Sequence, residues 1–248
     1  MPNQKLPITV FDSPADVEKA ALNLVRSIIA GASKEEPVHI VLAGGSTPRN
    51  LYERLAEVEE VPWENVHVWF GDERTVPPDH EDSNFGMAHD HLLSRIDIPA
   101  ENIHRMRGED DPAVAARDYS AEIEEYVHLR PSGMPEFDLV ILGLGEDGHT
   151  ASLFPDTEAL NATTEVVVAN EVPQEDTTRI TLTNPALNAA DHVLFLATGE
   201  SKAEPLAAIV EGGDDAPPAA FVHPVPGELH WYVDRAAASR LARDQDST

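Results

Sequence analysis

The sequence of 248 residues contains no cysteine. This absence excludes disulfide bonds, a thiolate nucleophile, and zinc or iron–sulfur sites built on cysteine. Any chemistry must therefore come from oxygen and nitrogen side chains. The sequence also lacks an apolar run long enough to cross a membrane, and residues 1–11 lack the basic and apolar regions of a secretory signal. We therefore expect a cytoplasmic protein.

Positively charged residues are scarce. Lysine and arginine total 17 against 45 aspartates and glutamates, which gives a formal net charge of −28. A surface field of that sign repels the phosphates of nucleic acids and of anionic lipids, so we expect neither a nucleic acid nor a membrane as a partner. A small anionic ligand would need local cations that hold it against this field.

The chain is long enough for one sizeable hydrophobic core, and no change of composition marks a domain boundary. We expect a single domain over residues 1–248, with a frayed tail at residues 244–248. Short apolar segments typical of buried strands occur at residues 38–43, 66–70, 137–144, 165–168, 179–182, 192–197 and 229–233. Segments typical of helices lie between them, at residues 17–29, 46–59, 83–93, 113–127, 185–190 and 202–210. This alternation predicts an α/β fold, a three-layer α/β/α sandwich with a mainly parallel sheet.

The strand at residues 38–43 runs into a glycine pair, two hydroxyl residues and Pro48. Glycines let the backbone approach a ligand closely, and the free N–H groups at a helix N-terminus attract anions. We interpret this stretch as a candidate phosphate site made by Gly44, Gly45, Ser46 and Thr47. An ordinary strand-to-helix turn explains the same pattern, with Ser46 or Thr47 as the helix cap and Pro48 at the first helical position.

A charged stretch, GDER, follows the strand at residues 66–70. Ligands of open α/β sheets bind beyond the carboxyl ends of the strands. Asp72 is therefore a candidate for fixing substrate hydroxyls or assisting proton transfer, and Arg74 for binding an anion through its planar guanidinium. The alternative is a solvated loop in which the acid and the base pair with each other.

The most specific stretch is GLGEDGHTASLFP at residues 143–155. It follows an apolar strand and brings Asp147 and His149 to the same strand end. Histidine titrates near neutrality and is a natural general base for activating water, and a nearby carboxylate can orient it. We expect both residues to be catalytic, although an isolated histidine is more often a structural or surface residue.

Two cations lie further along the chain. Arg179 begins one expected strand and Lys202 follows another, so both are candidates for capturing a phosphate, while each could equally form a surface ion pair. His80, His89 and His91 lie near carboxylates. Because His89 and His91 diverge around a helix, we expect a solvated helix face there rather than a metal site.

Taken together, GGSTP, GDER followed by SNFGMA, and GLGEDGHTASLFP, with Arg179 and Lys202 downstream, resemble the motifs of 6-phosphogluconolactonases. The motifs spread over residues 38–213. The resemblance implies a modified Rossmann-like sheet and hydrolysis of 6-phospho-D-glucono-1,5-lactone to 6-phosphogluconate in the pentose phosphate pathway. The expected ligand is a sugar-phosphate lactone, with no metal and no cofactor, and the protein is expected to be a monomer or a dimer.

The resemblance also suggests roles for the candidate residues. His149 would deprotonate the attacking water, and Asp72 and Asp147 would contact substrate hydroxyls or tune His149, with the division between them left open. The phosphate would be held by the glycine pair with Ser46 and Thr47, and by Arg74, Arg179 and Lys202.

Two alternatives remain. The loop of the related glucosamine-6-phosphate deaminases resembles GxDGHIAFNEP, with a glutamate before the last proline. Phe154 stands at that place and cannot supply a carboxylate, which favours the lactonases. The other alternative, a non-catalytic sugar-phosphate sensor, is disfavoured by the intact Asp147 and His149.

Overall fold

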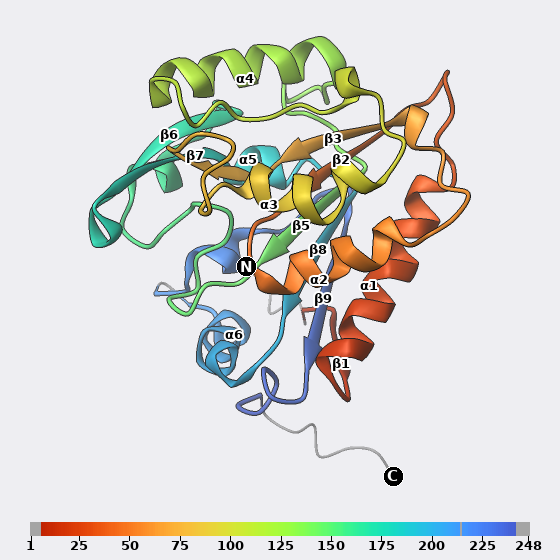
Figure 1. The fold of residues 1–248 in the computed structure, drawn as a ribbon. Helices are drawn as coiled ribbons and strands as arrows, with labels where there is room; N and C mark the ends of the chain where they lie inside the picture. The colour runs from red at the N-terminus through yellow and green to blue at the C-terminus, as the bar shows by residue number, and fades with distance from the viewer. Residues whose placement is uncertain (1–5, 214, 242–248) are drawn as a thin grey trace.

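A six-stranded parallel sheet forms the centre of the protein (Figure 1). The structure is a computed structural model that describes residues 6–213 and 215–241; the expected frayed tail at residues 244–248 lies outside them. The strands follow the order β1-β9-β8-β5-β2-β3. They are β1 (Ile8–Phe11), β2 (Val38–Leu42), β3 (Val66–Phe70), β5 (Leu139–Gly143), β8 (His192–Ala197) and β9 (Glu228–Asp234).

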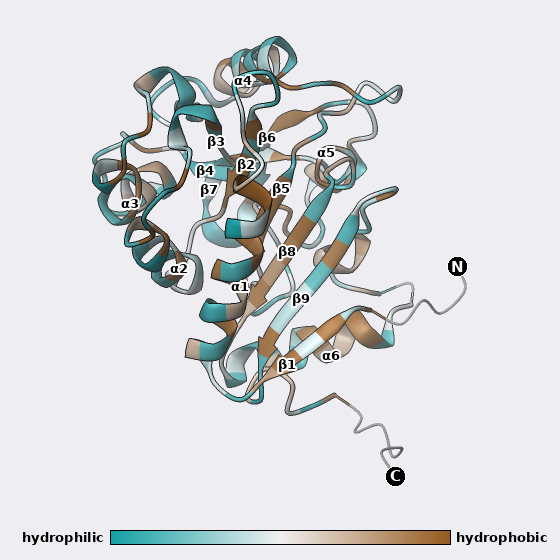
Figure 2. Cartoon of the chain, turned by 90° about the vertical axis from the view of Figure 1, so that its right-hand side faces the viewer, coloured by the Kyte–Doolittle hydropathy of each residue, from teal (hydrophilic) through white to brown (hydrophobic). Residues whose placement is uncertain are grey.

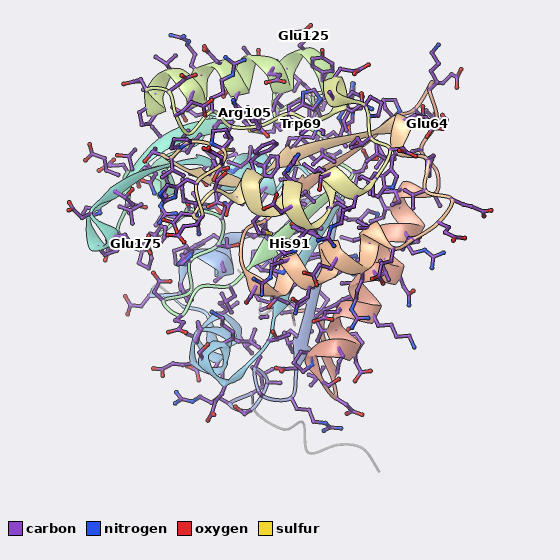
Figure 3. The ribbon with its side chains drawn as sticks, viewed as in Figure 1. Glu64, Trp69, His91, Arg105, Glu125 and Glu175 are labelled. Carbon is purple, nitrogen blue, oxygen red and sulfur yellow. The ribbon has the colours of Figure 1, made fainter. Side chains whose placement is uncertain are left out.

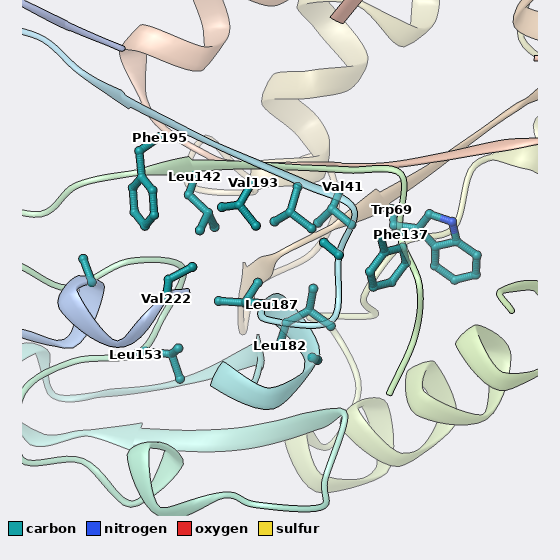
Figure 4. Packing of buried hydrophobic residues seen from close by; sticks show 14 of the residues in the cluster. Val41, Trp69, Phe137, Leu142, Leu153, Leu182, Leu187, Val193, Phe195 and Val222 are labelled. Atoms are coloured by element: carbon teal, nitrogen blue, oxygen red, sulfur yellow. The ribbon is translucent and has the colours of Figure 1, made fainter. Parts of the chain in front are cut away.

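Helices cover both faces of this sheet, so the predicted three-layer α/β/α sandwich is confirmed. One face packs against α1 (Pro14–Ile29), α2 (Ser46–Ala56) and α3 (Asn84–His91). The other packs against α4 (Pro112–Tyr126), α5 (Asn184–Leu187) and α6 (Ala203–Glu211). Every residue of β2 is buried, as expected of a strand covered on both sides. The central strands are correspondingly apolar in Figure 2, and Figure 4 shows the second core, with Phe195, Leu142 and Val193 on one side and Leu182 and Leu187 facing them.

A second, antiparallel sheet is the main departure from the predicted fold. It has the order β4-β7-β6 and is made of β4 (Asp72–Arg74), β6 (Val167–Val172) and β7 (Thr177–Leu182). The strands expected at residues 165–168 and 179–182 belong to this sheet and not to the parallel one. The four residues between β6 and β7 are too few for a crossover, so the two strands can only pair as a hairpin. The chain segments of β1 and β4 were not expected to be strands at all.

The start of α2 also differs from the expectation. Gly45 is the N-cap residue, with φ 100°, and the helix begins at Ser46. Ser46 and Thr47 therefore lie in the first helical turn and do not cap it, and Pro48 is not at the first position. None of the helices in the described ranges is long and apolar enough to cross a membrane.

Candidate active site

A cavity of about 350 Å³ opens at the carboxyl edge of the parallel sheet, beyond the ends of β2, β5 and β8. Its position agrees with the rule that ligands of open α/β sheets bind at this edge. Eight of the expected site residues line it: Gly44, Gly45, Ser46, Thr47, Asp72, Arg74, His149 and Lys202. Asp147 and Arg179 are not among the lining residues, but Asp147 is hydrogen-bonded to His149, which lines the cavity.

His149 and Asp147 form a hydrogen-bonded pair. Nδ1 of His149 is 2.6 Å from Oδ1 of Asp147, and the same oxygen accepts a hydrogen bond from the His149 backbone N–H at 3.1 Å. Because a carboxylate can only accept, Nδ1 carries the proton, and Nε2 is the basic nitrogen of the neutral imidazole. In the part of the chain that the structure describes, no hydrogen bond reaches Nε2. The cavity-lining imidazole therefore keeps a ring nitrogen that is chemically able to accept a proton.

The glycines of this loop make room for the imidazole. A Cβ atom on Gly145 would overlap the ring of His149 and Oδ1 of Asp147, so no other residue fits there without displacing these side chains. Gly148 has φ 79°, a backbone conformation that favours glycine. The imidazole also stacks on Phe154, with ring centroids 4.0 Å apart. The residue that distinguishes this loop from that of the deaminases thus packs directly against His149.

Asp72 is a buried carboxylate held by hydrogen-bond donors. Its Oδ2 accepts from Ser152 Oγ at 2.6 Å, and its Oδ1 accepts from Asn84 Nδ2 at 3.2 Å. Asn84 Nδ2 also donates to the carbonyl of Asp72 at 2.9 Å. Within the described residues no lysine or arginine forms an ion pair with Asp72, and these hydrogen-bond donors hold its carboxylate in place. A carboxylate fixed in this way is suited to accept hydrogen bonds from sugar hydroxyls.

The neighbouring Glu73 secures the segment that carries Asn84. Its carboxylate accepts from the backbone N–H groups of Arg74, Asn84 and Phe85 at 2.7–2.8 Å and from the Ser83 hydroxyl at 3.1 Å. Burial raises the pKa of Glu73, and these backbone donors partly offset that effect. Glu73 therefore joins β4 to the first turn of α3 on one side of the cavity.

The first turn of α2 is suited to bind an anion. Gly45 makes no side-chain capping bond, so the first N–H groups of the helix have no side-chain acceptor. Gly44 lies against Asn84 so closely that a Cβ atom would overlap its amide. Thr47 Oγ1 lies 3.0 Å from Thr198 Oγ1, which joins this turn to the end of β8.

The three expected cations have different surroundings. Lys202 lies at the end of a short 3-10 helix, Glu200–Lys202, directly after β8, and has no carboxylate partner among the described residues. The Arg74 guanidinium donates to the Asp82 carbonyl, while its buried Nε has no hydrogen-bond partner within residues 6–213 and 215–241. Arg179 lies opposite Arg74 in the β4–β7 pair but forms an ion pair with Glu175, and its buried Nε also lacks a partner in the same part of the chain. Arg179 therefore adjoins Arg74 without entering the cavity wall.

Sequence reasoning missed several residues of the site. Asn84, Ser152 and Thr198 hold the carboxylate of Asp72 or the turn of α2. Asn84 lies in the SNFGMA stretch and could have been found from it, because that stretch follows the charged segment GDER. Ser152 and Thr198 carry no comparable signal, since a single hydroxyl residue in a loop is common.

Comparisons with known proteins identify the family of the chain. Residues 12–231 match the family described as glucosamine-6-phosphate isomerases/6-phosphogluconolactonase. The chain is 42% identical over 226 residues to the 6-phosphogluconolactonase of Nostoc sp., with 90% of this chain and 92% of that protein covered. It is 39% identical over 242 residues to the 6-phosphogluconolactonase of Homo sapiens, with 94% and 93% covered.

Solved structures give the same result. The 6-phosphogluconolactonase from Trypanosoma brucei superposes with a TM-score of 0.86 at 32% identity, over 96% of this chain and 99% of that one. A monomeric glucosamine-6-phosphate deaminase superposes with a TM-score of 0.78 at 22% identity, which shows a shared fold alone. The resemblance seen in the motifs is thereby confirmed, and the chain belongs to the family of glucosamine-6-phosphate isomerases and 6-phosphogluconolactonases.

Proposed function

We propose that the protein is a 6-phosphogluconolactonase, which hydrolyses 6-phospho-D-glucono-1,5-lactone to 6-phosphogluconate in the pentose phosphate pathway. The observation that carries this proposal is the His149–Asp147 pair in the same cavity as Lys202 and the first turn of α2. Within the family, the lactonase names of the relatives at 42% and 39% identity favour this activity, as does Phe154 in place of a carboxylate. The proposal includes a cytoplasmic location and a single domain over residues 1–248.

The proposed reaction begins with water. Nε2 of His149 takes a proton from the water as its oxygen attacks the lactone carbonyl carbon, which gives a tetrahedral oxyanion. Backbone N–H groups of the glycine-rich loops would stabilise that oxyanion. The bond from the carbonyl carbon to the ring oxygen then breaks, and the imidazolium returns its proton to the leaving oxygen. The products are a carboxylic acid, which ionises, and a free hydroxyl, so the cycle needs no metal and no cofactor.

The geometry supports different roles for the two aspartates. Asp147 accepts the Nδ1–H of His149, so it orients the ring and stabilises the imidazolium. Asp72 lies at the cavity wall, fixed by Ser152 and Asn84, and would accept hydrogen bonds from the substrate hydroxyls. With this division each of the two carboxylates has a role, and His149 is the only base that the reaction needs.

The phosphate would bind among the first turn of α2, Lys202 and Arg74. Lys202 has no other anionic partner in the described residues, and Arg74 has a buried N–H group to satisfy. Arg179 would act from behind Arg74, because residues directly opposite in an antiparallel pair have Cβ atoms about 5 Å apart. A bound dianion would offset the repulsion between the two neighbouring guanidinium groups.

The test is a pH-controlled assay of lactone disappearance, corrected for spontaneous hydrolysis. Replacement His149→Ala should lower kcat by about 10²–10⁴-fold with little change in KM, because the loss concerns proton transfer. His89→Ala, which removes an exposed histidine on α3, is the matched control and should keep full activity. Full turnover by His149→Ala would contradict the assignment of the base.

The same assay examines the phosphate site. Lys202→Ala should raise KM for the phosphorylated lactone and reduce the preference over the unphosphorylated one. Equal use of the two lactones by the parent protein would overturn the phosphate assignment. Release of ammonia from glucosamine 6-phosphate, without lactone hydrolysis, would assign the protein to the deaminase branch instead.

A further inference from the structure

A second group of ligand side chains lies at the opposite edge of the parallel sheet. His192 is the first residue of β8, and Glu228 and His230 are the first and third residues of β9. The two strands are parallel neighbours, with His192 opposite Glu228 and Leu194 opposite His230. The proposed active site lies beyond the carboxyl end of β8, roughly 16 Å away at 3.3 Å per residue. This second group therefore takes no part in the proposed reaction.

The three side chains converge. Oε2 of Glu228 is 3.8 Å from Nδ1 of His192 and 3.5 Å from Nε2 of His230. All three ligand atoms lie within 4.8 Å of one another. Ligand atoms about 2.1 Å from a tetrahedral zinc ion are roughly 3.4 Å apart, so small side-chain rotations bring these atoms to coordinating positions.

The two ring nitrogens are buried and unsatisfied. Among the described residues, neither Nδ1 of His192 nor Nε2 of His230 has a hydrogen-bond partner, although both atoms are inaccessible to solvent. A buried nitrogen without a partner is unfavourable, and such groups are rare in folded proteins. Both nitrogens lie close to the same carboxylate oxygen, so one cation placed between them would satisfy all three groups. This observation points to a ligand independently of the spacing.

The charge of the site also favours a metal cation. Glu228 contributes a negative charge, and the net charge of −28 attracts cations to the protein. Two imidazoles with one carboxylate suit Zn²⁺, Co²⁺ or Ni²⁺ better than Mg²⁺ or Ca²⁺, which prefer oxygen ligands.

The other histidine cluster does not have this arrangement. His80, His89 and His91 each approach a separate carboxylate, namely Asp82, Asp90 and Glu53. Across residues 6–213 and 215–241, only His192, Glu228 and His230 bring three such ligand atoms together.

We propose that His192, Glu228 and His230 form a binding site for a divalent transition-metal ion such as Zn²⁺. The bound ion would link the amino ends of β8 and β9. The Glu228 side chain is 68% exposed, so a water molecule can complete the coordination from the solvent side. The site is structural: its expected effect is on stability and not on turnover.

The test uses the full chain after removal of metals with a chelator, and zinc sulfate alone as the probe. Isothermal titration at pH 7.5 should give one equivalent of zinc bound per chain. Glu228→Gln keeps the shape of an exposed side chain and should weaken binding at least tenfold, as should His192→Ala and His230→Ala. His128→Ala is the matched control, because His128 lies 3.8 Å from Glu136 without a third ligand, and it should bind zinc like the parent.

A second measurement guards against misfolded variants. Zinc should raise the melting temperature of the parent and of His128→Ala, since a ligand that binds only the folded state stabilises it. Glu228→Gln should melt like the metal-free parent and show no such rise. Absence of stoichiometric zinc binding by the parent, or equal binding by the parent and all three site variants, would overturn the proposal.

Discussion

His39 is an imidazole that burial keeps neutral. It is 6% exposed, and its Nδ1 accepts a hydrogen bond from the Trp69 indole N–H at 3.1 Å. Burial, together with the nearby His67 and His104, lowers the pKa of His39 to about 4. His67 and His104 lie 2.9 Å apart through ring nitrogens, and Glu122 binds the far side of His104. A line of histidines thus crosses one end of the sheet beneath α4.

This lowered pKa predicts a loss of stability in acid. Above pH 6.5 His39 is neutral in both states; between pH 6.5 and about 4 the unfolded chain binds a proton there and the folded chain does not. The unfolding free energy therefore falls as the pH falls through this window, by about 3 kcal/mol at its end. Urea denaturation at pH 7.0 and 4.5 measures the loss.

The variant His39→Gln keeps an acceptor for Trp69 but has no proton to gain. Its unfolding free energy should fall less between these two pH values than that of the parent, by about 2–3 kcal/mol. Carboxylates elsewhere titrate equally in both proteins, so they cancel in the comparison. Equal losses in the two proteins would show that His39 does not carry this dependence.

Glu73 lies in β4 and connects this strand to the start of α3. Its carboxylate accepts three backbone N–H groups, two of them in the first turn of α3. β4 has three residues and α3 has eight. Because both elements are short, the buried hydrogen bonds of Glu73 do much to fix their position relative to each other. Arg74 and Asn84, which line the cavity, depend on that position.

Glu73→Gln should therefore affect both stability and binding. The amide NH₂ group faces at least one backbone N–H where a carboxylate oxygen accepted, which leaves a buried donor unsatisfied and costs about 1–3 kcal/mol. We expect a lower melting temperature and a raised KM with a smaller change in kcat, because His149 lies on another loop. Glu125→Gln, on the exposed face of α4 (Figure 3), is the control and should change neither quantity. If the two variants had the same melting temperature and the same KM, Glu73 would not have this role.

The protein carries far more aspartates and glutamates than the proposed reaction needs. Glu64, Glu125 and Glu175 project from separate edges of the fold in Figure 3, and all three are exposed. Most carboxylates have no lysine or arginine of their own, because only 17 lysines and arginines are available to 45 aspartates and glutamates. This repulsion opposes the compact state, and dissolved salt screens it.

The melting temperature should therefore rise as KCl is increased from low to molar concentration at pH 7.5. The same series near pH 4.5, the isoelectric point, should give a flatter dependence, because the net charge is then close to zero. A melting temperature at pH 7.5 that stays constant or falls with added salt would contradict this account.

Local patterns in the sequence were sufficient for much of the fold. The strand expected at residues 192–197 is β8 with the same bounds, since a continuous apolar run bounded by polar residues is a local signal. The glycine-rich loop after β5 likewise indicated His149 as a site residue, because the glycines and the histidine are close in the chain. The three charged residues of β4 carried no such signal: they form a strand because β7 pairs with them, and not because of their own propensity.

The sequence was thus enough to predict the α/β/α layers, the family and most of the cavity wall, because these depend on periodicity and on motifs a few residues long. Folding was needed to separate β6 and β7 into a second sheet, to bind Arg179 to Glu175, and to leave Nε2 of His149 free. Folding also brought His192 beside Glu228 and His230. His192 is far from these two residues along the chain and lies next to them only because β8 and β9 are parallel neighbours. Such pairings depend on strand register, and register is a property of the packed sheet that no single segment encodes.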